Sequence, residues 1–149
     1  MELILWRHAE AEDATAAGDA ARALTKRGRK QAERMGEWLR RRISDEWRVL
    51  ASPAKRAVQT AKGLGMDFEE SEALGTGASS ASILRAADWP HGERSVVVVG
   101  HEPTLGEVAA KLLGARKEIP VRKGAIWWFA YKNGEAVLRA VLEPEMLEP

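Results

Sequence analysis

The chain has 149 residues, with 23 Lys and Arg against 22 Asp and Glu, three His and no Cys. This length predicts a single domain, residues 1–149, that buries its own core without disulfides or structural metals. The near-zero net charge of +1 argues against a nucleic-acid-binding protein, in which basic side chains dominate one face. The absence of cysteine excludes thiol catalysis and thiolate metal sites. No apolar run reaches membrane-spanning length and no secretory leader is evident, so we expect a cytoplasmic protein without membrane contact.

The N-terminal region predicts a strand, a loop and a helix. The apolar run Leu3–Trp6 predicts a buried strand that leads directly into Arg7 and His8. Residues 9–23 are rich in Ala, Asp, Glu and Gly, and their apolar residues show no regular spacing. This predicts a loop that contains a fragment of helix. The loop is long enough to border a site. From Thr25, a helix cap, apolar residues recur at three- and four-residue spacing, which predicts an amphipathic helix. These residues are Ala32, Met35, Gly36, Leu39 and Ile43.

A second strand and helix surround an arginine. The run 47–51 predicts a strand, and Ser52 followed by Pro53 predicts that a helix begins there and continues to Leu64. Arg56 would then lie in the first turn, beside the positive end of the helix dipole. Backbone donors, the dipole and a guanidinium together favour a bound phosphate or carboxylate.

The middle of the chain predicts a third unit of the same kind. Residues 66–78 are turn-rich and their structure is left open, and Ser79 or Ser80 is expected to cap a short helix that ends near Ala87. The run Val96–Gly100 has no polar alternation, which predicts a strand buried on both faces and followed by His101. We expect Pro103 to begin a helix that Gly114 ends.

The C-terminal region shows a different pattern from the strand–helix units before it. Asn133 and Gly134 separate two apolar runs, 125–131 and 136–142, and Asn-Gly between such runs is the strongest short signal for a β-hairpin. Together these elements predict a three-layer α/β/α sandwich with a mostly parallel central sheet and a C-terminal antiparallel hairpin.

Four side chains follow predicted strand ends. Because ligands bind beyond the carboxyl ends of the strands in open α/β sheets, we expect Arg7, His8, Arg56 and His101 to form one site. Arginine presents paired donors that match phosphoryl oxygens, while a neutral imidazole nitrogen is a nucleophile that can carry a phosphoryl group. Phosphoryl transfer depends mainly on positioning and charge stabilisation, so this set needs no cofactor.

Three other interpretations remain open on the residues alone. The two arginines and two histidines could bind phosphate passively, without turnover. A metal site from His8, His101 and Glu102 is conceivable, although two neighbouring arginines would oppose a divalent cation. The Trp127–Trp128 pair could stack nucleic-acid bases, but sheet packing is the favoured interpretation without a basic stripe.

Four segments resemble, in order and spacing, the motifs of the histidine phosphatase superfamily, whose members are also described as phosphoglycerate mutase-like. The segments are Leu5–Ala11, Leu24–Ala32, Ser52–Thr60 and Gly100–Pro103. The short length and the alanine at position 9, where the best-known motif has glycine, are most similar to the SixA-type phosphohistidine phosphatases. The resemblance implies that His8 becomes phosphorylated, that Arg7 and Arg56 hold the phosphoryl oxygens, that His101 adds a phosphate contact, and that water then hydrolyses the phosphohistidine. From the residues themselves we expect no metal or cofactor.

One departure from the superfamily bears on the substrate. Many members have a carboxylate shortly after the second helix as general acid, but this chain has Leu74 to Gly77 there, and Glu10 and Glu102 are the first alternatives. A leaving alkoxide needs a proton, whereas the nitrogen of phosphohistidine leaves more readily. We therefore expect the phosphohistidine of a protein as substrate, such as a histidine-phosphotransfer domain in signal transduction. The alternatives are a small phosphomonoester as substrate, or a phosphoprotein-binding module without turnover.

Overall fold

The structure is a computed structural model and describes residues 1–149. Its strands are β1 (Glu2–Arg7), β2 (Arg48–Ala51), β3 (Glu69–Glu70), β4 (Val96–Gly100), β5 (Ile126–Lys132) and β6 (Glu135–Leu142), and its helices are α1 (Lys26–Arg40), α2 (Lys55–Lys62), α3 (Ser80–Ala86) and α4 (Thr104–Leu113). Short 3₁₀ turns lie at Asp19–Ala21, Glu72–Leu74 and Pro144–Leu147.

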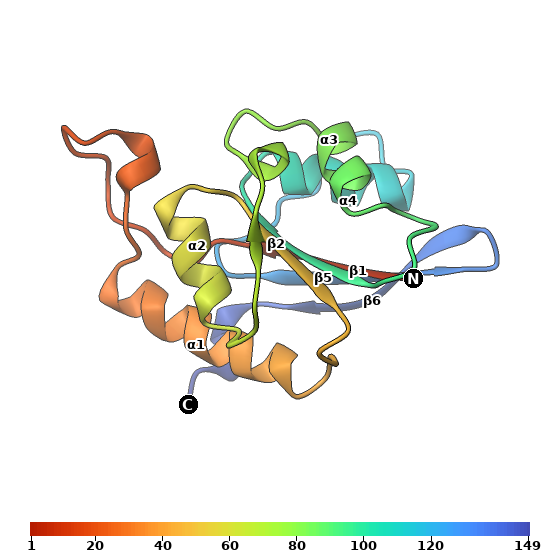
Figure 1. Cartoon of the computed structure of the whole chain (residues 1–149), viewed down its shortest axis with the longest axis horizontal. Coiled ribbons are helices and arrows are strands. Elements are labelled where there is room, and N and C mark those ends of the chain that lie inside the picture. The colour runs from red at the N-terminus through yellow and green to blue at the C-terminus, as the bar shows by residue number, and fades with distance from the viewer.

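All six strands form one sheet in the order β3-β2-β4-β1-β5-β6. The first four of these run parallel, while β5 is antiparallel to both β1 and β6. Helices α3 and α4 cover one face of the sheet and α1 and α2 the other (Figure 1). The structure thus confirms the predicted three-layer sandwich with its C-terminal antiparallel hairpin.

The core consists of two layers, one on each face of the sheet. In β4, Val96 and Val98 pack with α3 and α4, and Val97 and Val99 pack with α1 and α2. Successive side chains of a strand point to opposite faces, so a strand covered on both faces needs an apolar residue at every position. All four valines are fully buried, which confirms the prediction from the uninterrupted valine run.

Several predicted element ends are confirmed. Thr25 accepts the Gly28 N–H and caps α1, and Ser79 caps α3. Gly114 ends α4 in the left-handed conformation. Asn133 and Gly134 both have positive φ, 52° and 82°, as a two-residue hairpin turn of the primed type requires.

Other boundaries were predicted wrongly. Helix α2 begins at Lys55, not at Pro53, because residues 53 and 54 form a bend before the first helical turn. Helix α1 ends at Arg40, and Ile43 lies in the turn beyond it. The two-residue strand β3 was not predicted, because two exposed glutamates show no hydrophobic pattern.

The tryptophan pair belongs to the fold. Trp128 is buried and packs edge-on against Trp38 and Trp47, and Trp127 stacks with Phe129. These contacts favour sheet packing over base stacking. None of the four helices combines the length and hydrophobicity that crossing a bilayer requires.

Candidate active site

The carboxyl ends of β1, β4 and β2 lie side by side and bring the site together. Arg7 pairs with Gly100 in the sheet register, and the ladder continues past the strands: the His8 N–H donates to Gly100 O (3.1 Å) and the Ser52 N–H to Val99 O (3.0 Å). His8 and the residue after Gly100, His101, are therefore neighbours, with ring centroids 5.3 Å apart. This confirms that the two histidines meet at one edge of the sheet.

His8 is a buried neutral imidazole. Its Nδ1 lies 2.8 Å from the carbonyl oxygen of Ala9. A carbonyl only accepts, so Nδ1 carries the proton and Nε2 keeps a free lone pair. Burial is the main cause that lowers the pKa of His8 to about 3, and the positive charges of Arg56 and Arg7 lower it further. At neutral pH, Nε2 is thus available as a nucleophile.

His101 is held by a serine that sequence reasoning had assigned only to a helix start. Ser52 Oγ accepts the Ala54 N–H (3.2 Å) and lies 2.7 Å from His101 Nε2. We assign the Ser52 proton to that second bond, which leaves the imidazole proton on Nδ1. His101 Nδ1 is buried and has no hydrogen-bond partner in the protein. Burial, followed by the charge of Arg56, lowers the pKa of His101 to about 4.

Both arginines are anchored through Nη1 and keep an unpaired Nε. Arg7 Nη1 donates to Val121 O (3.0 Å), and Arg56 Nη1 donates to Asp19 O (3.0 Å). In each case Nε is buried and has no partner. The side-on edge of a guanidinium, formed by Nε and Nη2, matches two oxygens of a phosphoryl group. Both arginines therefore keep phosphate-binding capacity after their structural bonds are made.

The residues around His8 fix its backbone. Ala9 is fully buried, and its N–H donates to Thr60 Oγ1 (3.0 Å), whose hydroxyl donates to Arg56 O (2.8 Å). On the other side, the Gly124 N–H donates to the carbonyl oxygens of Arg7 (3.1 Å) and His8 (2.9 Å). His8 and the two arginines are therefore connected to one another through α2 and through the segment that precedes β5.

Glu102 supports this segment. Its carboxylate accepts the N–H groups of Gly106 (2.6 Å) and Val121 (3.3 Å), and the Val121 carbonyl is the anchor of Arg7. Burial raises the pKa of Glu102, while these two N–H bonds and Arg7 oppose the rise. Both carboxylate oxygens thus serve the backbone. No group of three or more His, Asp or Glu side chains is placed to hold a metal ion, so the geometry does not support the metal alternative.

Asp19 is the carboxylate that sequence reasoning missed. The predicted loop 9–23 contains a 3₁₀ turn at Asp19–Ala21, and there Asp19 Oδ2 accepts from Arg56 Nη2 (3.1 Å). No motif marks Asp19 in the sequence, because a long non-helical loop leaves its contacts undetermined. The four residues that the sequence predicted, Arg7, His8, Arg56 and His101, lie close together, as the distance between the two histidine rings and the charges acting on His8 show.

Comparison with known proteins agrees with this geometry. Residues 3–75 match the family model of the histidine phosphatase superfamily, branch 1. A phosphohistidine phosphatase SixA homolog of Haemophilus influenzae is 34% identical, with 89% of this chain and 92% of that protein aligned. The phosphohistidine phosphatase SixA of Escherichia coli is 30% identical over 75% of this chain and 74% of its own.

A solved structure of the protein histidine phosphatase SixA complexed with tungstate has the same fold. Its TM-score is 0.83 at 26% identity, and the match covers 99% of this chain and all of that one. The order of motifs, the sheet topology and the relatives agree: the chain belongs to the histidine phosphatase superfamily, in the family of the SixA phosphohistidine phosphatases.

Proposed function

We propose that this protein is a single-domain, cytoplasmic phosphatase that hydrolyses phosphohistidine on a partner protein, with His8 as the covalent nucleophile and without a metal or cofactor. Arg7, Arg56 and His101 bind the phosphoryl oxygens. A histidine-phosphotransfer domain is the partner that this chemistry favours, because such a domain presents a phosphorylated imidazole at its surface.

One observation supports the proposal above the others. Close to His8, whose Nε2 is free, three buried nitrogen atoms have no hydrogen-bond partner in the protein: Arg7 Nε, Arg56 Nε and His101 Nδ1. Buried polar groups are nearly always paired, so three unpaired nitrogen atoms close to His8 indicate that a polar ligand binds there. A phosphoryl group has three oxygens to accept these donors, and its charge is complementary to the two guanidinium groups.

The reaction follows in two displacements. In the first, His8 Nε2 attacks phosphorus, the bond from phosphorus to the substrate nitrogen breaks, and its electron pair stays on the substrate imidazole. In the second, water attacks the phosphorus of phospho-His8 and loses a proton to solvent. The bond to Nε2 breaks, its electron pair returns to that nitrogen, and phosphate leaves with the oxygen from water. Arg7 and Arg56 stabilise the charge on the equatorial oxygens in both steps, because their orientation is set before the substrate binds.

The carboxylates near the site favour a P–N substrate over a phosphomonoester. Hydrogen bonding to Arg22, with a further contribution from Arg56, lowers the pKa of Asp19, so this group is ionised at neutral pH and is a poor proton donor. Glu102 is engaged with two backbone N–H groups. Neither Asp19 nor Glu102 is thus a ready acid for an alkoxide leaving group, whereas an imidazole leaves as a neutral ring once its other nitrogen is protonated from solvent.

A substrate panel tests the proposal. We expect turnover of a phosphorylated histidine-phosphotransfer protein and of phosphoramidate, modest turnover of an activated aryl phosphate, and almost none of a sugar phosphate. The chelator EDTA should leave every rate unchanged. Comparable kcat/KM for a sugar phosphate would favour the small phosphomonoester instead, and binding of phosphohistidine without turnover would favour the non-catalytic module.

A further inference from the structure

The turn at Asp19–Ala21 reaches back to the site from an otherwise exposed segment. Residues 9–23 leave the sheet after β1 and project beyond α2 before they return to α1 (Figure 1). Asp19 contacts Arg56 twice, through its backbone carbonyl to Nη1 (3.0 Å) and through Oδ2 to Nη2 (3.1 Å). The Arg56 side chain is only 5% exposed, while that of Asp19 is 55% exposed. An exposed turn thus holds the guanidinium of the buried Arg56 by two hydrogen bonds.

The two contacts occupy one particular edge of the guanidinium. Asp19 takes the end-on edge, formed by Nη1 and Nη2, and the side-on edge with the buried, unpartnered Nε stays free. A guanidinium is planar, so fixing the end-on edge by two bonds also fixes the direction of the side-on edge. Asp19 therefore sets the orientation of Arg56 without using the donors that a phosphoryl group needs.

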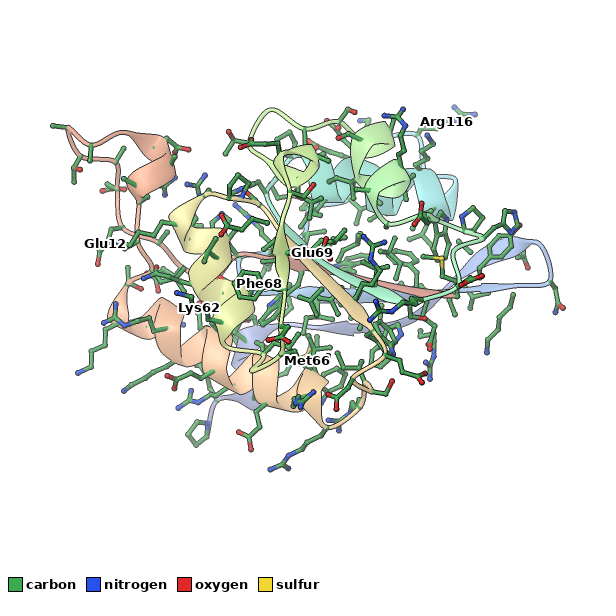
Figure 2. All side chains as sticks on the ribbon, viewed as in Figure 1. Glu12, Lys62, Met66, Phe68, Glu69 and Arg116 are labelled. Carbon is green, nitrogen blue, oxygen red and sulfur yellow. The ribbon has the colours of Figure 1, made fainter.

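Asp19 is itself held in place by a second arginine. Arg22 Nη1 donates to Asp19 Oδ1 (3.2 Å), and Arg22 Nε donates to the carbonyl oxygen of Glu12 (2.7 Å). Figure 2 labels Glu12 on the segment that leaves the sheet, ahead of the turn. A continuous chain of contacts, from the Glu12 backbone through Arg22 and Asp19, ends at Arg56.

We propose that Asp19 is a positioning residue for phosphoryl transfer, which acts by aiming the side-on edge of Arg56 at the phosphoryl oxygens. The proposal rests on the phosphate-binding role of Arg56 given above. A carboxylate so close to the site also repels a phosphate dianion, but its charge is balanced by two arginines and its oxygens are turned to them. Orientation therefore outweighs repulsion, and removal of the carboxylate weakens phosphate binding.

The test compares D19N with E12Q. Each variant removes one negative charge from the same exposed segment, but the Glu12 side chain has no hydrogen bond or ion pair, and the Glu12 carbonyl is kept. We expect D19N to reduce kcat/KM for an aryl phosphate by about 10-fold, on the scale of one preorganised donor lost in part. Calorimetry with inorganic phosphate should show that the Kd for phosphate rises by a similar factor, about 10-fold. E12Q should match the unmodified protein in both, and D19E should restore part of the loss.

A double-mutant cycle with R56K shows whether Asp19 acts through Arg56. Lysine has no side-on edge to orient, so D19N should cost about 10-fold beside Arg56 and less than about 2-fold in the R56K background. Equal costs in both backgrounds, or tighter phosphate binding by D19N, would overturn the proposal. The phosphate titration needs no phosphohistidine substrate, so a failure of the proposed substrate class would leave this result interpretable.

Discussion

Replacement of Ser52 by alanine tests the geometry around His101. Ser52 is completely buried, and its hydroxyl makes two bonds, one to the Ala54 N–H and one to His101 Nε2. The substitution removes both bonds and leaves the imidazole nitrogen buried without a partner. Without the Ser52 hydroxyl, nothing fixes which ring nitrogen of His101 carries the proton.

The magnitude follows from a matched serine elsewhere in the fold. Ser71 Oγ accepts the Ala73 N–H at 3.3 Å, the same local contact that Ser52 makes with Ala54 at 3.2 Å, but Ser71 bonds no histidine. Ser71→Ala should lower the free energy of unfolding by about 0.5–1.5 kcal/mol, the net value of one hydrogen bond. Ser52→Ala should cost about 1–3 kcal/mol more, because an unpaired buried acceptor is left behind.

Urea unfolding and steady-state kinetics measure the two effects. Besides the stability loss, Ser52→Ala should lower kcat/KM by about 10-fold, which corresponds to about 1.4 kcal/mol of transition-state stabilisation. Ser71→Ala should leave kcat/KM unchanged. If the two variants match in both stability and kcat/KM, the bond between Ser52 and His101 has no energetic role and the reasoning fails.

Three further outcomes are expected. Arg7→Ala and Arg56→Ala should each lower kcat/KM by about 100-fold or more, with partial recovery by lysine, and near-normal kinetics would contradict the proposed binding of the phosphoryl oxygens by these arginines. Because His8 and His101 have lowered pKa values, about 3 and about 4, the unfolded chain binds more protons below pH 6.5, and stability should fall as pH drops from there. Urea titrations should show that His8→Gln removes a slope of up to about 1.4 kcal/mol per pH unit; an unchanged slope would disprove the His8 contribution. Gly134→Val should lower the Tm by straining a turn residue at φ 82° while kcat stays normal, and an unchanged Tm would argue against strain.

The sequence predicted those parts of the fold that local patterns determine. The valine run of β4 specifies a doubly covered strand, Thr25 and Ser79 mark helix starts, and Asn133-Gly134 closes the hairpin. Strand ends also indicated that Arg7, His8, Arg56 and His101 would lie close together, because parallel strands align their carboxyl ends.

Contacts across long sequence separations could not be predicted in this way. Asp19 meets Arg56 from a loop whose path is set by its return to α1, and Ser52 meets His101 because β2 and β4 are neighbours in the sheet. The start of α2 was also misplaced: Ser52 accepts the Ala54 N–H within a bend that precedes the helix, and its hydroxyl also contacts His101. In each case a side chain has a partner that only the tertiary structure defines.

The identity of the phosphorylated residue tests the central claim most directly. A phosphoryl donor labelled with ³²P, quenched during turnover and followed by peptide mapping, should leave acid-labile, alkali-stable label on His8. His8→Ala should lose both label and turnover, while His91→Ala, which alters a loop histidine packed on Tyr131, should keep both. Label on His101 or on a hydroxyl side chain, together with an active His8→Ala variant, would contradict the account.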